Sequence, residues 1–233
     1  MKAPRMILLD AGCTLFDFAS IDTLKGVEAF MPEILDNPEA FTAEEIDEKI
    51  NLIHNRFGPA RMQGYEIPCQ SILRSALDSL SLVFKCEIPK IEELYWEHSA
   101  AFSPVDGAAE LIEGLRARDI RMAVVCNNEF SGKVVSASLD RLFPRNRFEF
   151  VITSGDYGMR KPDRALFEAA VGMSALEPDQ LWYVGDKVNV DVRGALAAGI
   201  QPVFFRRYAA NKIELPEGVA VADELEQILD WLK

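Results

Sequence analysis

The chain has 233 residues, and its hydrophobic fraction of 49% is ordinary for a globular protein. Its net charge of -12 and its pI of about 4.7 disfavour nucleic acid and membrane surfaces as partners, because both are anionic. The sequence shows no apolar run near the roughly 20 residues of a membrane span, and we expect no signal peptide. The cysteines have neither paired nor metal-site spacing, so we expect reduced thiols and a cytoplasmic protein. They are Cys13, Cys69, Cys86 and Cys126.

The first predicted element is a buried strand at Met6–Leu9, an apolar run that ends at Asp10. Residues 18–103 then contain no run typical of a buried strand, and their apolar residues recur at helical spacing. This stretch is far longer than the usual connection of about 4–6 residues. We therefore predict an inserted, all-helical domain at residues 18–103, within a core domain formed by residues 1–17 and 104–233.

From residue 104 onwards, strand and helix patterns alternate. Four apolar runs predict further buried strands, namely Met122–Val125, Phe150–Thr153, Leu181–Val184 and Val203–Phe205. Helical patterns lie at about Gly107–Arg118, Ser131–Leu139, Arg164–Met173, Val192–Ala198 and Ala222–Leu232. This alternation predicts an α/β fold with three layers, a Rossmann-like core in which helices cover both faces of a mostly parallel sheet.

Polar residues follow the predicted strands, and the carboxyl ends of parallel strands form the edge where ligands bind. Asp10 follows the first strand, Asn127 the second and Lys161 the third, while two aspartates lie in residues 185–191 after the fourth. Carboxylates with free coordination positions suit Mg²⁺. A nearby lysine would screen a carboxylate nucleophile from an incoming anion, and amide groups could hold phosphate oxygens. These residues predict a site for a small phosphorylated molecule.

In this order, the motifs make the sequence similar to the haloacid dehalogenase-like (HAD) hydrolase superfamily over nearly the whole chain. The motifs are Asp10–Thr14, Cys126-Asn127, Lys161-Pro162 and Gly185-Asp186 with Asp191. Each is weak alone, but each follows a predicted strand, and residues 153–163 are especially close to the family pattern. The resemblance implies a helical cap of type C1, closing over the strand ends with hinges near Phe16–Phe18 and Ser103–Pro104.

The resemblance also implies the chemistry of the central residues. Asp10 would be the nucleophile that forms an aspartyl-phosphate, and Lys161 would neutralise Asp10 and the substrate anion. The implied cofactor is Mg²⁺. Its ligands would be Asp10, Asp186 and Asp191, together with the backbone carbonyl of Gly12.

Two positions depart from the family pattern. Cys126, which with Asn127 and Lys161 would contact the substrate phosphate, stands where the family usually has Ser or Thr. Gly12 stands where most phosphatases of the family have an aspartate that acts as general acid and base. Such help is typically worth about 10²–10⁴ in rate, or roughly 3–5 kcal/mol.

Three functions are compatible with these departures. The one we favour is a Mg²⁺-dependent phosphatase whose activity is reduced, or whose substrate has a leaving group that needs no proton, as in an acyl phosphate. The second is a phosphonatase- or dehalogenase-like hydrolase. Lys25 could serve a phosphonatase, but a dehalogenase would not need Asp186 and Asp191. The third is a catalytically impaired protein that binds metal and phosphate. The sequence leaves the substrate and the oligomeric state open.

Overall fold

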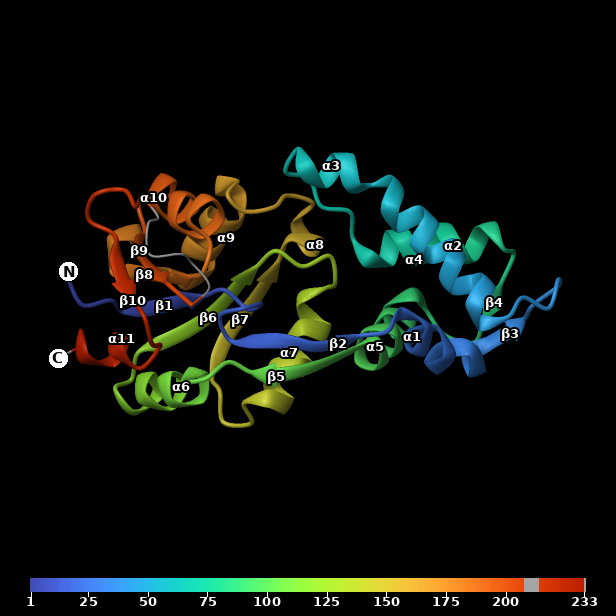
Figure 1. The fold of residues 1–233 in the computed structure, drawn as a ribbon, viewed down its shortest axis with the longest axis horizontal. Coiled ribbons are helices and arrows are strands. Elements are labelled where there is room, and N and C mark those ends of the chain that lie inside the picture. Colours follow the sequence, from blue (N-terminus) through green and yellow to red (C-terminus); the bar gives the residue numbers. More distant parts are fainter. Residues whose placement is uncertain (208–213, 233) are drawn as a thin grey trace.

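Six parallel strands form the central sheet in the computed structural model, which describes residues 1–207 and 214–232 (Figure 1). The strand order is β10-β9-β8-β1-β6-β7. The strands are β1 (Met6–Leu9), β6 (Arg121–Cys126), β7 (Phe148–Thr153), β8 (Leu181–Gly185), β9 (Gln201–Phe205) and β10 (Ala220–Ala222). All five predicted strands are confirmed, and with them the parallel α/β fold.

Helices cover both faces of this sheet. Alternate residues of β1 point to opposite sides, so Ile7 and Leu9 pack in one hydrophobic cluster while Met6 and Leu8 pack in another. The first cluster includes residues of α6 (Ala108–Ala117), α7 (Gly132–Leu142) and α11 (Gln227–Asp230). The second includes residues of α9 (Arg164–Ser174) and α10 (Arg193–Ala197). This arrangement confirms the three layers.

The C-terminal segment differs from the prediction. A helix was expected at Ala222–Leu232, but Ala220–Ala222 forms the edge strand β10 and the helix α11 covers only Gln227–Asp230. The short segment pairs in parallel with β9, so Val221 lies opposite Phe204. Three small apolar residues show too little periodicity to distinguish a strand from a helix. Here they form a strand because they pair with β9 at the edge of the sheet.

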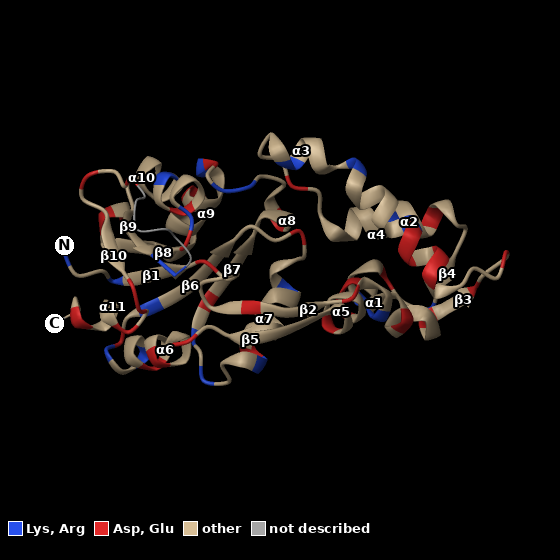
Figure 2. Cartoon of the chain, viewed as in Figure 1, with Lys and Arg blue, Asp and Glu red and all other residues tan. Residues whose placement is uncertain are grey.

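The insert is built mainly from five helices around its own hydrophobic cluster. They are α1 (Thr23–Phe30), α2 (Ala43–Arg56), α3 (Gly58–Met62), α4 (Cys69–Ser79) and α5 (Ile88–Ser99). A capping box starts α2, where the side chains of Thr42 and Glu45 each accept from the other residue's backbone N–H. Acidic residues gather on α2 at the outer end of the insert (Figure 2).

Contrary to the prediction, the insert is not purely helical. Two antiparallel strand pairs accompany the helices, β2 (Phe16–Ile21) with β5 (Ala100–Pro104), and β3 (Ile34–Asp36) with β4 (Val83–Phe84). Most of their residues are exposed or half-buried, so they lack the continuous apolar run by which buried strands are recognised. The pair β2–β5 carries both chain crossings between core and insert, and it includes the two predicted hinge segments.

Aromatic side chains join the insert to the core. The indole of Trp96 in α5 donates a hydrogen bond of 2.8 Å to the hydroxyl of Ser138 in α7. Phe130 packs against both the insert's cluster and the cluster of the core. In the described part of the chain, no helix has the length and apolar character needed to span a membrane.

Candidate functional site

The predicted nucleophile and lysine meet at the carboxyl ends of the strands. The Nζ of Lys161 lies 2.7 Å from Oδ1 of Asp10 and 2.7 Å from Oδ1 of Asp191. Asp10 follows β1, and Asp191 lies in the short π-helical turn Val188–Val192 after β8. Exposure is only 3% for Lys161, 5% for Asp10 and 1% for Asp191, so one buried cation serves two buried carboxylates.

Burial and charge act against each other at this cluster. Burial opposes the charged form of Lys161, but attraction by Asp10 and Asp191 prevails and raises the pKa of its ammonium group. Burial raises the pKa of Asp10 to about 6, because desolvation and the negative charge of Asp191 outweigh the attraction of Lys161. A single lysine therefore leaves the carboxylates short of positive charge.

A third carboxylate completes a group suited to a metal ion. Ligand atoms of Asp10, Asp186 and Asp191 all lie within 4.8 Å of one another. Oδ1 of Asp186 is buried without a hydrogen-bond partner in the described part of the chain, although Nζ of Lys187 lies 3.6 Å away. Buried carboxylate oxygens with excess negative charge fit Mg²⁺, which prefers hard oxygen ligands. A ligand role for the carbonyl of Gly12 stays a prediction.

The glycine of the Gly185-Asp186 motif is explained by a close approach. A Cβ atom on Gly185 would lie 2.5 Å from Cγ of Asp191, which is closer than side chains pack. The Oδ2 atom of Asp191 also accepts a hydrogen bond of 2.9 Å from the backbone N–H of Lys187. Glycine at this position therefore lets the Asp191 carboxylate fold back against the end of β8.

Tyr183 belongs to the same cluster, although the sequence did not indicate it. Nζ of Lys161 donates to the Tyr183 hydroxyl at 2.5 Å, and that hydroxyl donates to the carbonyl of Val125 at 2.8 Å. Because Tyr183 lies inside an apolar strand, its sequence context is that of a core residue. Its hydroxyl and the Val125 carbonyl, 3.2 Å from Nζ, give the lysine two further fixed partners, which hold the ammonium group between Asp10 and Asp191.

Asn127 and Cys126 were predicted to contact a phosphate group. The Asn127 side chain instead pairs with the backbone of Lys161, donating to its carbonyl at 3.0 Å and accepting from its N–H at 2.7 Å. Cys126, at the end of β6, is buried in the core cluster, and burial raises the pKa of its thiol to about 12. In this structure Asn127 positions the lysine, while phosphate binding by either residue stays a prediction.

The backbone around Gly12 leaves space for a side chain. A Cβ atom placed on Gly12 would meet one neighbour within 4 Å, the Cε2 atom of Phe18 at 4.0 Å. Asp17, the nearest later carboxylate, forms two contacts of 2.8 Å with the guanidinium of Arg207. Asp17 therefore forms an ion pair with Arg207. The structure has room for a side chain at residue 12, so steric hindrance does not explain the glycine there.

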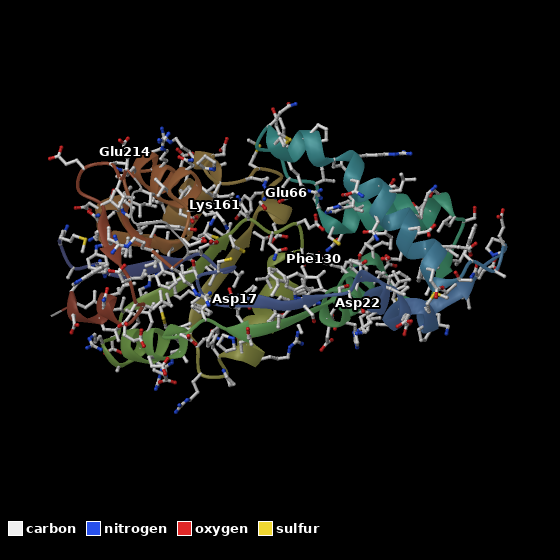
Figure 3. The ribbon with its side chains drawn as sticks, in the orientation of Figure 1. Asp17, Asp22, Glu66, Phe130, Lys161 and Glu214 are labelled. Carbon is white, nitrogen blue, oxygen red and sulfur yellow. The ribbon has the colours of Figure 1, made fainter. Side chains whose placement is uncertain are left out.

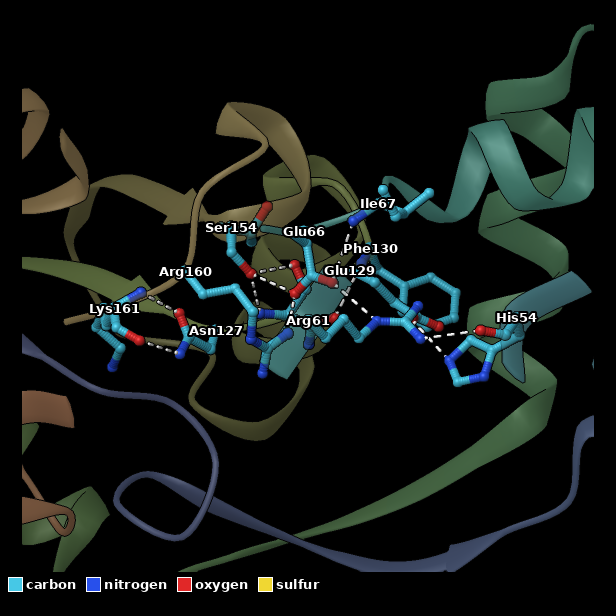
Figure 4. Close-up of polar contacts among 12 residues, drawn as sticks. His54, Arg61, Glu66, Ile67, Asn127, Glu129, Phe130, Ser154, Arg160 and Lys161 are labelled. Carbon is cyan, nitrogen blue, oxygen red and sulfur yellow. Dashed lines mark hydrogen bonds and ion pairs between the residues drawn. The ribbon is translucent and has the colours of Figure 1, made fainter. Parts of the chain in front are cut away.

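A buried glutamate of the insert reaches the loop that carries the lysine. Glu66 is 2% exposed and contacts the guanidinium of Arg160, the residue before Lys161 (Figure 4). It also accepts hydrogen bonds from Arg61 at 3.1 Å and from the Ser154 hydroxyl at 2.7 Å. Figure 3 shows Glu66 at the end of the insert that faces Lys161. The position of the insert is thereby tied to the lysine loop.

The same network continues to a histidine. Arg61 donates to the Glu129 carboxylate at 2.5 Å, and Nε2 of His54 lies 3.0 Å from that carboxylate (Figure 4). The hydrogen bond to Glu129 raises the pKa of His54, against the opposing effects of burial and of Arg61. These contacts join α2 and α3 of the insert to the loop after β6.

Comparison with known proteins agrees with the fold. The family described as "Haloacid dehalogenase-like hydrolase" matches residues 15–205. The chain therefore belongs to the haloacid dehalogenase-like hydrolases.

Similar proteins include a nucleotidase and a phosphatase. Haloacid dehalogenase-like hydrolase domain-containing protein 3 of Homo sapiens is 32% identical over 114 residues, 48% of this chain and 44% of that protein. The chain thus spans less than half the length of that relative. Pyrimidine 5′-nucleotidase YjjG of Escherichia coli is 26% identical over 232 residues, 96% of each chain. Phosphoserine phosphatase of Thermus thermophilus is 28% identical over 51% of this chain and 47% of the enzyme.

Solved structures share the fold. The 2-haloacid dehalogenase of Pseudomonas syringae has a TM-score of 0.60 at 19% identity, covering 98% of both chains. The HAD phosphatase of Thermococcus onnurineus has a TM-score of 0.58 at 17% identity, covering 97% of both chains. At these identities the likeness shows the fold alone.

The carboxylate cluster predicts stabilisation by a divalent cation. Excess MgCl₂ should stabilise the wild type and so raise its thermal unfolding midpoint. At a concentration a hundredfold above Kd, the free energy of unfolding should rise by about 2.7 kcal/mol. Asp186→Asn should lose most of this rise. Asp179→Asn, at an exposed aspartate paired with Lys2, should keep it. An equal rise in all three proteins, measured by scanning calorimetry, would rule out the cluster as the cation site.

His54 predicts a pH-dependent stability. A raised folded-state pKa stabilises the fold below the unfolded value of about 6.5, and this contribution is lost as pH rises through the raised pKa. His54→Gln should therefore lower the free energy of unfolding more at about pH 6 than at about pH 8.5. Urea titrations measure this difference, with His98→Gln as the control. If wild type and His54→Gln change in parallel with pH, the His54–Glu129 contact is not stabilising.

Proposed function

We propose that this chain is a Mg²⁺-dependent phosphatase that hydrolyses a small phosphorylated molecule through an aspartyl-phosphate at Asp10. The observation that carries the proposal is the buried Asp10 carboxylate, 2.7 Å from Lys161 and close to a buried oxygen of Asp186 that accepts no hydrogen bond in the described part of the chain. Named phosphatases among the relatives support it, and the nucleotidase YjjG matches over nearly the full length.

The proposed hydrolysis has two chemical steps. In the first, a carboxylate oxygen of Asp10 attacks phosphorus, and the bond from phosphorus to the leaving oxygen breaks. In the second, water attacks the same phosphorus, releasing inorganic phosphate and restoring the Asp10 carboxylate. Lys161 offsets the negative charge of Asp10 and of the phosphate, and Asn127 and Tyr183 hold the lysine in place. A cation bound by the aspartates would stabilise charge on the phosphate oxygens.

Gly12 restricts which substrates react well. Without a carboxyl at this position, the leaving group departs without a proton from that residue, and the attacking water is not activated there. A leaving group that is stable as an anion, such as the carboxylate of an acyl phosphate, tolerates this loss better than an alkoxide. The proposed activity therefore favours phosphates with good leaving groups.

The alternative hydrolases receive less support from the site. A dehalogenase has no use for a cation, whereas Asp186 provides a buried oxygen that accepts no hydrogen bond in the described part of the chain and lies beside two other carboxylates. A phosphonatase needs a lysine that forms a Schiff base. The Lys25 ammonium lies 3.1 Å from Asp22 and its side chain is 67% exposed, as expected of a surface residue. A protein that binds metal and phosphate without turnover is the outcome to test against.

Removing the nucleophile should abolish turnover. Asp10→Asn replaces the attacking carboxylate by an amide of the same size, and we expect acetyl phosphate hydrolysis to fall by at least about 10⁴-fold. Phosphate release in the presence of Mg²⁺ measures this loss, and Asp179→Asn is the control. Comparable activity in Asp10→Asn and wild type would contradict the proposal.

Restoring a carboxyl at residue 12 should increase activity. Gly12→Asp fits the open space beside Phe18, and we expect the hydrolysis of alkyl phosphates to rise by about 10²–10⁴-fold. Gly12→Asn is the matched control, because it adds the same volume without an acid. The gain should be small for acetyl phosphate, whose leaving group needs no proton. Equal rates for Gly12→Asp and Gly12→Asn would mean that more than acid–base help is missing.

A further inference from the structure

A cavity of about 380 Å³ lies between the insert and the core. Four aromatic side chains contribute to its wall, Phe18, Tyr95, Trp96 and Phe130. The Tyr95 and Phe130 rings are stacked with centroids 6.1 Å apart, and those of Trp96 and Phe130 are 4.4 Å apart. Aliphatic side chains extend this wall, namely Ile21, Ile50 and Ile72. Walls of this kind suit a flat apolar group, which gains both buried area and ring contacts.

The cavity adjoins the catalytic cluster through three of its lining residues. Phe18 is the neighbour of the open space at Gly12. Asn127 is bonded to the backbone of Lys161, and Arg160 precedes that lysine in the chain. A phosphate group held at Asp10 and Lys161 would therefore direct its leaving group towards this cavity.

The charges in the cavity wall are already paired. His54 and Glu129 form one pair at 3.0 Å, and Arg160 is paired with the buried Glu66. The other polar groups of the lining are neutral and include Thr23, Asn51 and Ser99. A charged leaving group would lose water here without gaining an uncommitted partner of opposite charge, which costs several kcal/mol for a buried ion. A neutral group would avoid this cost.

We propose that this cavity receives the leaving group of the substrate and selects an uncharged aromatic ring, so that the substrate class is an aryl phosphate ester. The inference rests on the proposed phosphatase function and adds its substrate class. An aryl oxide also suits Gly12, because it departs with the electron pair of the broken phosphorus–oxygen bond and takes its proton from solvent.

A matched pair of substrates tests the selection. Phenyl phosphate and 4-carboxyphenyl phosphate have the same ring and similar leaving oxygens, but the second carries an extra negative charge. With Mg²⁺ present, kcat/KM should be at least about tenfold higher for phenyl phosphate, mainly through a lower KM. Equal values, or a preference for the carboxylated ester, would overturn the inference.

A variant of Ile21, an exposed residue of the cavity lining, tests whether the preference for phenyl phosphate arises in the cavity. Ile21 lines the cavity and is 66% exposed, so a lysine at this position should not disturb the fold. Ile21→Lys should reduce the preference for phenyl phosphate at least about fivefold by attracting the carboxylated ester. Val83→Lys, at an exposed residue outside the cavity lining, should keep the wild-type preference. An unchanged preference in Ile21→Lys would place the leaving group elsewhere.

Measuring ligand binding apart from hydrolysis distinguishes failure of the aryl inference from failure of the proposed phosphatase function. Calorimetry of the wild type with phenylphosphonate and 4-carboxyphenylphosphonate measures selection without hydrolysis, and tighter binding of the uncharged ligand is expected. If acetyl phosphate is hydrolysed through Asp10 but both phosphonates bind equally, the aryl inference fails and the phosphatase stands. If the uncharged phosphonate binds more tightly but no phosphate is hydrolysed, the cavity's selectivity stands and the phosphatase fails, and with it the aryl ester as a substrate.

Discussion

One ammonium group, that of Lys161, lies buried between the carboxylates of Asp10 and Asp191, and each contact is 2.7 Å long. An uncompensated charge in such a place is strongly destabilising, so the arrangement persists only because all three groups are present together. The segments that follow β1, β7 and β8 each contribute one of them, which makes the cluster a consequence of the parallel sheet. Asp186 adds further negative charge, and this excess is the physical reason to expect a cation.

The insert takes part in this arrangement through the residue beside the lysine. Glu66 contacts Arg160, and the backbone N–H groups of Glu66 and Arg160 donate to the carbonyls of Gly158 and Gly64 at 2.9 and 2.8 Å. The loop that carries Lys161 is therefore held by Asn127 from the core and by Glu66 from the insert. This double attachment couples the walls of the aromatic cavity to the position of Lys161.

Much of this organisation could be predicted from the sequence. Buried parallel strands are continuous apolar runs, so β1 and its neighbours were found, and the polar residues after them led to Asp10, Lys161 and Asp191. The ribbon formed by β2 and β5 was missed because its residues are largely exposed.

Other features depend on tertiary contacts that no local pattern records. Tyr183 has the sequence context of a core residue, and Glu66 has that of a surface loop. The fold brings Tyr183 next to the buried Lys161 and Glu66 next to the half-buried Arg160. Asn127 was predicted as a phosphate contact, which stays a prediction, and only the structure shows that its amide holds the lysine backbone.

The central claim is that Asp10 becomes phosphorylated, and the missing carboxyl at Gly12 makes this state easier to detect. Without that group the attacking water is poorly activated, so hydrolysis of the aspartyl-phosphate should be slower than its formation from an acyl phosphate. The direct measurement is rapid acid quenching during turnover of phosphate-labelled acetyl phosphate, followed by peptide mapping by mass spectrometry. We expect a label on Asp10 that approaches one per chain and is released by hydroxylamine. Sustained phosphate release with no label on Asp10 would contradict it.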